Sequence, residues 1–206
     1  RLKEIAMNKG FTPSSLNTYK NCPMQFYYEK ILKIKEPAGM EETIEANTLG
    51  TVVHRALEDF YRPCLNRQIN TGDLKAMLPK IPTKLKELFQ EEFKSGIFNK
   101  GKNKLIYTVA EQFLHSFIKK ELKLISKGNE IHIKGLEKDL KTEICIEEID
   151  FAVKLNGNAD RIDKLNGQLR IIDYKTGKVE LNELQTDDMG KLIRDKKFHK
   201  GFQLYL

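Results

Sequence analysis

The sequence is poor in cysteine and has no long apolar segment. Its 206 residues contain three widely spaced cysteines, Cys22, Cys64 and Cys145. An odd number of separated cysteines without a Cys-x-x-Cys pair disfavours a disulfide framework and favours the reducing cytoplasm. No apolar run approaches the roughly 18 residues that a transmembrane helix needs, and the N-terminal segment has no signal-peptide pattern. We therefore expect a cytoplasmic protein without a membrane partner.

Charge is abundant and unequal in sign. Charged residues make up 32% of the chain and hydrophobic residues 40%, as in a soluble globular protein with a substantial core. The net charge of +7 is by itself a weak pointer to nucleic acid. Beside an acidic metal site, however, it would fit a protein that cuts a negatively charged polymer. Because the chain starts at Arg1, we expect a fragment of a longer polypeptide.

Helical periodicity dominates the first 127 residues. Pro13-Ser14-Ser15 provides a helix start, and Pro23 divides the pattern that follows into two segments, with Cys22 at the corner. Further helices are expected over about residues 48–61, 73–94 and 105–126. In the last of these, the predicted buried face consists of Val109, Phe113, Phe117, Leu124 and Ile125.

The hydrophobic period changes from that of a helix to that of a strand beyond Gly128. The alternation predicts strands that lead into a hairpin over Gly157–Lys178, and helical patterns return over residues 181–194 and from Phe198 onward. This order predicts an α/β or α+β fold with a mostly antiparallel sheet. We expect a single domain of residues 1–206, mainly helical over 1–127 and with a β-sheet core over 128–206.

The hairpin carries a turn signal that fixes its register. Asn166-Gly167 is typical of a two-residue type I′ turn, in which both residues need positive φ. When the strands are paired outward from this turn, Asp160 stands opposite Asp173 and shares one face with it and with Lys175. Two carboxylates about 5 Å apart repel each other, and a divalent cation between them removes the repulsion. The hairpin therefore predicts a hard-metal site beside a catalytic lysine.

Other polar residues have less specific patterns. Asp163 falls on the opposite face from Asp160 and opposite Arg170, which predicts a structural salt bridge. His54 lies at the edge of an apolar helical stripe, where a structural histidine is more common than a ligand. Glu137, in a stretch rich in lysine and glutamate, fits a surface residue.

Five motifs occur in a specific order. The hairpin contributes the strings GNADRID at 157–163 and IDYKTG at 172–177. The first half contributes Ser15-Leu16-x-x-Tyr19-x-x-Cys22-Pro23-x-x-Phe26 and Gly50-Thr51-x-x-His54-x-x-Leu57-Glu58. Gln203 would begin a QxxxY motif whose last position, 207, lies beyond these residues. Together the motifs resemble those of the PD-(D/E)XK nuclease superfamily, in particular of RecB/AddB-like nuclease domains.

The resemblance implies a restriction-endonuclease-like core, with a mixed β-sheet flanked by helices and helical N-terminal elements. It also implies ligands for Mg²⁺ or Mn²⁺: His54, Asp160, Asp173 and the backbone carbonyl of Tyr174. Lys175 would orient the attacking water and counter charge on the scissile phosphate, and Gln203 would position the substrate or the lysine. Glu137 stands where many relatives carry an additional acidic residue.

Three further residues close to these motifs are candidates for contact with the DNA backbone: Arg161, Thr176 and Lys178. For Arg161, a structural ion pair is an equally open alternative. Some family members bind a [4Fe–4S] cluster through one cysteine at the Cys22 position and three beyond the QxxxY motif. Cys64 and Cys145 do not have that spacing, so no complete iron–sulfur site is expected within these residues. Cys22 is either a lone ligand of a longer protein or a packing residue.

The implied activity is that of a Mg²⁺- or Mn²⁺-dependent deoxyribonuclease. The resemblance points to the exonuclease domain of a RecB/AddB-like helicase–nuclease in DNA recombination and repair, with DNA as substrate and a helicase domain or subunit as partner. The alternative is a non-catalytic DNA-binding or scaffold module of the same complex. A phosphate-binding loop at Lys175–Lys178 is disfavoured, because the upstream glycine spacing of such a loop is missing.

Overall fold

The fold is that of a computed structural model, which describes residues 1–34, 43–93 and 98–206. The chain forms two compact units. Unit 1 consists of Arg1–Ala38, Asp139–Asn158 and Lys178–Leu206, and unit 2 of Gly39–Lys138 and Ala159–Gly177. The single domain expected over residues 1–206 stays a prediction.

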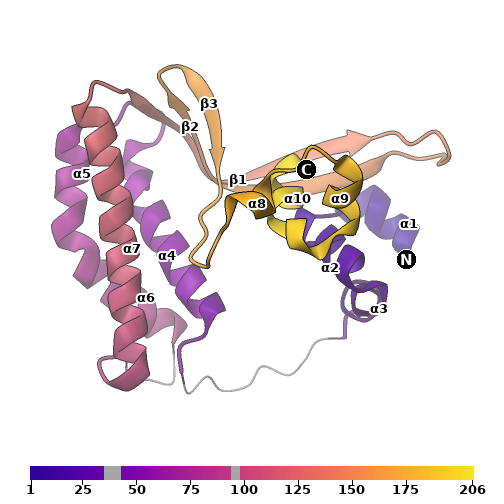
Figure 1. The fold of residues 1–206 in the computed structure, drawn as a ribbon, viewed down its shortest axis with the longest axis horizontal. Helices are drawn as coiled ribbons and strands as arrows, with labels where there is room; N and C mark the ends of the chain where they lie inside the picture. The colour runs from indigo at the N-terminus through magenta and orange to yellow at the C-terminus, as the bar shows by residue number, and fades with distance from the viewer. Residues whose placement is uncertain (35–42, 94–97) are drawn as a thin grey trace. The chain divides into compact units, whose positions relative to one another are not determined.

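Unit 2 is built on long helices that lie side by side (Figure 1). They are α4 (Ala46–Tyr61), α5 (Thr71–Met77), α6 (Ile81–Glu92) and α7 (Gly101–Ser126), with short 3₁₀ turns at Arg62–Cys64 and Leu78–Lys80. Helix α4 packs on α6 and α7, and α5 packs on α7. On α4 the buried positions Val53, Ala56, Leu57 and Phe60 recur at the spacing of one helical face.

The helix predicted over about residues 73–94 is divided in two by prolines. Pro79 and Pro82 each lie in the first two positions of a new element, the 3₁₀ turn and α6. Proline lacks a backbone N–H and is tolerated at a helix start, so both residues begin elements instead of kinking one long helix. Lys94, the last residue of the predicted helix, lies outside the described residues.

The buried face of α7 differs from the predicted one. Val109 and Phe113 are exposed, at 36% and 39%. The buried residues are Ala110, Leu114, Ile118 and Glu121. The face is therefore rotated by one position, toward a stripe that includes a buried glutamate.

The sheet follows the predicted hairpin register. Among the described residues, β1 (Ile131–Ile144), β2 (Val153–Leu165) and β3 (Gln168–Ile172) form a sheet in the order β1-β2-β3. Strands β2 and β3 are antiparallel, and their ladder runs from Leu165 opposite Gln168 to Arg161 opposite Ile172. Asn166 and Gly167 have φ values of 50° and 85°, as the type I′ turn requires. Strands β1 and β2 each contribute residues to both units.

The hairpin turn is tied to the segment that leads into β1. The Asn166 amide N–H donates to Glu130 O, and Asn166 Oδ1 accepts from the Glu130 N–H, each at 2.9 Å. Asn166 Nδ2 also donates to Asn129 Oδ1 at 2.9 Å. Main chain and side chain of one turn residue thus hold the connection between α7 and β1.

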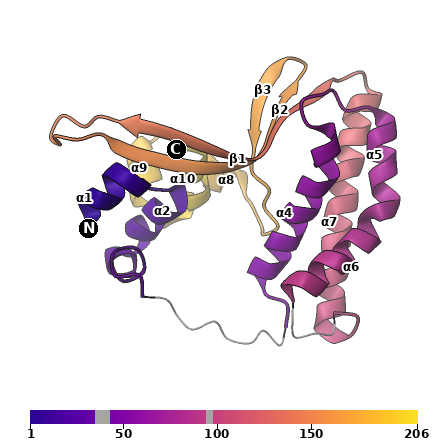
Figure 2. The same cartoon turned by 180° about the vertical axis from the view of Figure 1, so that it is seen from behind.

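Unit 1 consists mainly of short helices from the two ends of the chain. From the N-terminal end come α1 (Leu2–Glu4), π-helical turns at Ile5–Lys9 and Tyr27–Ile31, α2 (Pro13–Asn21) and α3 (Pro23–Phe26). From the C-terminal end come α8 (Leu181–Leu184), α9 (Met189–Arg194), a 3₁₀ turn at Lys196–Phe198 and α10 (His199–Tyr205). Helix α2 packs against α10 (Figure 2), and Asn17 Nδ2 donates to His199 O at 2.9 Å.

The predicted interruption at Pro23 is confirmed. Helix α2 ends before Cys22, and Pro23 is the first residue of α3. Cys22 caps α3, because its Sγ accepts a hydrogen bond from the Gln25 N–H at 3.4 Å. The cap of α2 is Thr12, which forms a reciprocal capping box with Ser15.

The architecture has the predicted fold class, a mixture of α and β structure with helices packed around an antiparallel hairpin. None of the described helices is both long and apolar enough to cross a membrane.

Candidate metal centre

Helix α4 presents His54 from the edge of its buried stripe. His54 is partly buried, with 29% of its side chain exposed. Its Nε2 donates to the backbone carbonyl of Tyr174 at 2.8 Å, and its Nδ1 lies 3.5 Å from Asp160 Oδ2. Both partners are acceptors, which suits an imidazole protonated on both nitrogens. Hydrogen bonding to Asp160 accordingly raises the pKa of His54 above its ordinary value, although burial opposes the rise.

Strand β2 presents Asp160, whose side chain is 10% exposed. Asp160 Oδ2 accepts a hydrogen bond from the backbone N–H of Tyr174 at 2.5 Å. The peptide groups of Tyr174 therefore touch both proposed side-chain ligands, Asp160 through the N–H and His54 through the carbonyl. Tyr174 itself is buried, with its ring edge-on to those of His54 and Phe117.

Strand β1 presents Glu137 through an unusual backbone conformation. Glu137 has a φ of 45°, which L-residues other than asparagine and aspartate rarely adopt, and it lies in the middle of the strand. Burial and the negative charges of Asp160 and Glu58 raise the pKa of its carboxyl. A strained residue that carries a carboxylate next to another carboxylate points to a functional site.

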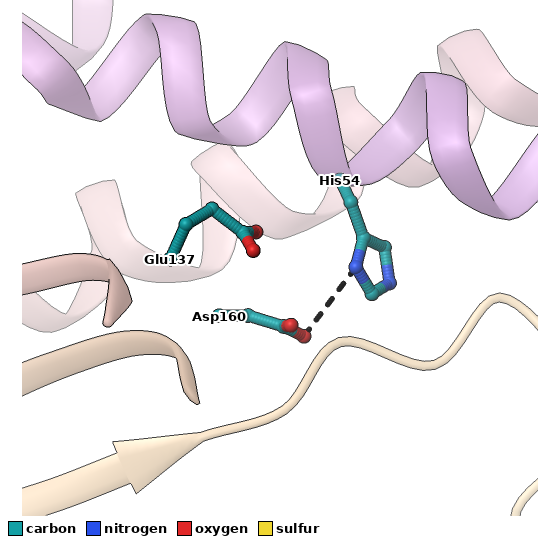
Figure 3. A group of neighbouring side chains, drawn as sticks. All are labelled: His54, Glu137 and Asp160. Atoms are coloured by element: carbon teal, nitrogen blue, oxygen red, sulfur yellow. Dashed lines mark ion pairs between the residues drawn. The ribbon is translucent and has the colours of Figure 1, made fainter. Parts of the chain in front are cut away.

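These three residues meet in space. One potential ligand atom from each of His54, Glu137 and Asp160 lies within 4.8 Å of the other two. Figure 3 shows the three side chains converging from α4, β1 and β2. Two carboxylates and one imidazole form a donor set that fits Mg²⁺ or Mn²⁺, and a cation there would neutralise the repulsion between the carboxylates.

Asp173 departs from the predicted pairing. The β2–β3 ladder ends at Arg161 opposite Ile172, one pair short of Asp160 and Asp173. Asp160 instead accepts the Tyr174 N–H, and Asp173 Oδ2 lies 2.7 Å from Lys175 Nζ. Both arrangements lower the repulsion that two directly opposed carboxylates would suffer. Asp173 is not part of the three-residue group, and its role as a ligand stays a prediction.

Arg161 lies in the interior. Its side chain has 0% exposure and pairs with Asp163 and Glu121, each at 2.5 Å. We call Glu121, Arg161 and Asp163 the buried ion cluster. The structure has the ion-pair alternative for Arg161, and a guanidinium without exposed surface does not reach a DNA backbone. The salt bridge predicted between Asp163 and Arg170 is confirmed at 2.8 Å.

The remaining candidates are distributed over both units. In unit 2, Lys175 is 37% exposed and Thr176 is partly buried. In unit 1, Lys178 is exposed and pairs with Glu180, and Gln203 lies on α10. The roles expected for these four residues stay predictions. Cys22 caps α3, Cys64 is buried and Cys145 is exposed.

Sequence reasoning missed Glu121. In the sequence it is one of many charged residues on a lysine-rich helix, and the predicted stripe excluded it. In the structure it is 5% exposed and accepts hydrogen bonds from Tyr61 and Arg161. Its spacing of three to four residues from Ile118 and Leu114 was the available signal, because it continues the stripe of small and aliphatic residues.

Comparison with known families defines the class of protein. A family model described as the PD-(D/E)XK nuclease superfamily matches residues 10–204. The chain therefore belongs to the PD-(D/E)XK nuclease superfamily.

Among curated proteins, the chain is similar to a set of bacterial proteins, each named as the B-type subunit of an ATP-dependent helicase/deoxyribonuclease. It is 32% identical to the protein of this name from Clostridium perfringens (strain SM101) over 224 aligned residues, which cover 100% of this chain and 18% of that protein. The proteins of the same name from Carboxydothermus hydrogenoformans and Alkaliphilus oremlandii are 27% and 29% identical, over 87% and 82% of this chain. The chain spans 17% and 16% of the length of these two relatives.

Proposed function

We propose that the chain is a Mg²⁺- or Mn²⁺-dependent deoxyribonuclease, and that it acts as the exonuclease domain of a RecB/AddB-like helicase–nuclease in DNA recombination and repair. The observation that carries the proposal is the convergence of His54, Glu137 and Asp160 within 4.8 Å. Membership of a nuclease superfamily and the deoxyribonuclease names of the relatives support it. The net charge of +7 suits a polyanionic substrate.

His54, Glu137 and Asp160 would hold the cation, and Asp173 and the Tyr174 carbonyl are further proposed ligands. When bound, the cation polarises the phosphate and lowers the pKa of an attacking water. The Tyr174 N–H contributes by fixing one oxygen of Asp160. His54 would exchange its hydrogen bonds to Tyr174 and Asp160 for coordination, so the donor atoms lie in place before binding.

Lys175 is the proposed catalytic cation. Its ammonium lies 2.7 Å from Asp173, on the segment that leaves β3. At this position it would orient the water and offset negative charge that develops on the phosphate. Gln203 would position the lysine or substrate, and Thr176 and Lys178 would contact the DNA backbone.

The proposed partners follow from the relatives. Their name couples a helicase to a deoxyribonuclease, so we propose DNA as the substrate and a helicase domain or subunit as the partner. A cytoplasmic location is part of the same proposal.

A cleavage assay tests the activity. Linear single- and double-stranded DNA would be incubated with the chain and Mg²⁺ or Mn²⁺, with and without EDTA. Lys175→Ala should lower kcat by about 10²–10³-fold, the cost of removing one charge-stabilising group. The matched control is Lys164→Ala, which removes an exposed lysine from β2 of the same hairpin and should leave the rate unchanged.

Two outcomes would decide against the proposal. Wild-type protein that cuts neither form of DNA with either metal is not a nuclease under these conditions. If it nevertheless binds DNA in a salt-dependent manner, the non-catalytic DNA-binding module is the better description. Cleavage that survives both EDTA and Lys175→Ala would reject the assigned site.

A further inference from the structure

The buried ion cluster is a neutral group of charges inside unit 2. Arg161 Nε and Nη2 donate to Asp163 Oδ2 at 2.8 and 2.5 Å, and Nη2 also donates to Glu121 Oε1 at 2.5 Å. Tyr61 Oη donates to Glu121 Oε2 at 2.5 Å. Arg170 donates to both oxygens of Asp163, at 2.8 and 2.9 Å. Two arginines and two carboxylates are thus joined in one network.

Such a network is a costly way to stabilise a core. Each buried ion loses several kcal/mol of hydration, and replacing a buried ion group by apolar residues of similar volume is often neutral or stabilising. The surrounding core is well supplied with apolar side chains, including Leu114, Ile118 and Ile133 at 0% exposure. Stability alone therefore gives a weak reason for charges at this place, and their geometry suggests a second one.

The network reaches the metal centre through an aromatic layer. The Arg161 guanidinium lies over the Tyr61 ring at 4.6 Å and over the Phe117 ring at 5.9 Å. Phe117 packs edge-on against the Tyr174 ring, with centroids 5.2 Å apart. Burial raises the pKa of the Tyr174 phenol, and the charge of Arg161 opposes that rise, so the two side chains act on each other.

Two chain connections meet at this layer. Arg161 follows Asp160 directly on β2, so fixing one side chain of the strand fixes the orientation of the next. Tyr174 has its ring in the layer and its peptide groups bonded to Asp160 and His54. A shift of Arg161 would therefore move the metal centre by both routes.

We propose that Arg161 is a positioning residue of the metal centre. Its ion pairs hold β2 against α7, and the aromatic layer beneath it sets the place of the Tyr174 ring. The Tyr174 peptide groups then keep the ligand side chains of β2 and α4 in register for the cation. The proposal rests on the proposed function, because it assigns a role toward the metal that the nuclease would use.

The test compares a charged and an apolar version of the cluster. The triple variant Tyr61→Phe/Glu121→Met/Arg161→Met removes the donor, the acceptor and the guanidinium together, and Asp163 keeps its partner Arg170. Arg161→Lys keeps the charge and loses the planar fork that pairs with two carboxylates. Arg67→Met is the matched control, because Arg67 forms a comparable fork with Asp73 at the start of α5.

Mn²⁺ affinity is measured by calorimetry without DNA, and kcat and KM with linear DNA. We expect the triple variant to unfold cooperatively and to bind Mn²⁺ at least about 10-fold more weakly, as is typical when residues that orient metal ligands are lost. Its kcat should fall while KM for DNA stays within about twofold, since the buried cluster does not touch the substrate. Arg161→Lys should lie between wild type and the triple variant, and Arg67→Met should match wild type.

Several results would overturn the proposal. A folded triple variant or a folded Arg161→Lys variant with wild-type Mn²⁺ affinity removes the positioning role. If the triple variant does not fold, Arg161→Lys decides alone, and failure of both to fold assigns the cluster to stability only. Wild-type protein that binds no Mn²⁺ rejects the metal centre and with it the proposed function. Binding by wild type and variant alike rejects only the role of Arg161.

Discussion

The strained backbone of Glu137 gives a prediction in which removing a functional residue stabilises the metal-free protein. With a φ of 45°, Glu137 occupies the left-handed region. That conformation costs an L-residue about 1–2 kcal/mol, and glycine avoids the cost. Glycine in a strand loses about 0.5–1 kcal/mol through its greater freedom in the unfolded chain. Glu137→Gly should therefore gain roughly 0.5–1 kcal/mol from the backbone.

Electrostatics add to this gain. Burial and the nearby charges of Asp160 and Glu58 raise the pKa of Glu137, so its ionised form is less favourable in the folded than in the unfolded protein. The destabilisation is present at neutral pH and disappears as the pH falls below the unfolded pKa of about 4.3. Glu137→Gln removes the charge and keeps the strained φ, so it separates the two contributions.

The assay is thermal unfolding with EDTA and then with Mn²⁺. A gain of about 1 kcal/mol raises the Tm of a chain of this size by roughly 2–4 °C. In EDTA we expect the order Glu137→Gly, then Glu137→Gln, then wild type. Wild type should gain about 2.7 kcal/mol from Mn²⁺ at 100 times its Kd. The variants should gain less, because they lack one carboxylate, so the order should reverse.

The reasoning fails on either half of this result. If Glu137→Gly is less stable than wild type in EDTA, the positive φ does not store strain. If Mn²⁺ raises the Tm of Glu137→Gly as much as that of wild type, the Glu137 carboxylate does not hold the metal.

Three other substitutions test the packing of unit 2. Gly50→Ala should raise the free energy of unfolding by about 0.5–1 kcal/mol, because a Cβ within α4 would meet Thr176 Oγ1 at 3.7 Å, an ordinary contact. Arg161→Met should lower it by about 3–5 kcal/mol, since it leaves buried carboxylates unpaired. Asp73→Asn should cost about 1 kcal/mol at pH 7, because hydrogen bonding to Arg67 lowers the pKa of Asp73. That contribution is complete above the unfolded pKa of about 3.9 and is lost as the pH falls through the lower folded pKa.

Urea unfolding measures all three free energies. A decrease for Gly50→Ala would mean that the segment at Thr176 comes closer to α4 than its position indicates. A loss below about 1 kcal/mol for Arg161→Met would show that water or neighbouring groups replace the guanidinium. A difference between Asp73→Asn and wild type that persists unchanged to low pH would reject the charged hydrogen bond as its source.

The hairpin could be predicted from the sequence because its determinants are local. The Asn166-Gly167 turn sets the pairing, and each β-branched pair then follows by counting outward, as far as Arg161 opposite Ile172. The next pair could not be predicted in the same way. Whether Asp160 faces a carboxylate or a peptide N–H depends on the path of the chain after β3, which no turn signal specifies.

The face of α7 and the place of Glu137 depend on distant partners. A glutamate is buried only when a cation lies against it, and the cation for Glu121 comes from β2, far along the chain. Spacing on α7 alone therefore favoured Val109 and Phe113 over the true stripe. Glu137 resembles a surface acid because its positive φ, which directs it to Asp160, leaves no trace in local composition.

The anchored hairpin turn has a consequence for protein engineering. Exposed two-residue turns are usual places to insert a tag or a fluorescent domain, because loop tips tolerate added length. Here Asn166 is held by both neighbours of the α7–β1 connection, Asn129 and Glu130. An insertion between Asn166 and Gly167 would release these bonds and loosen the start of β1, so fusion partners are better placed elsewhere on the surface.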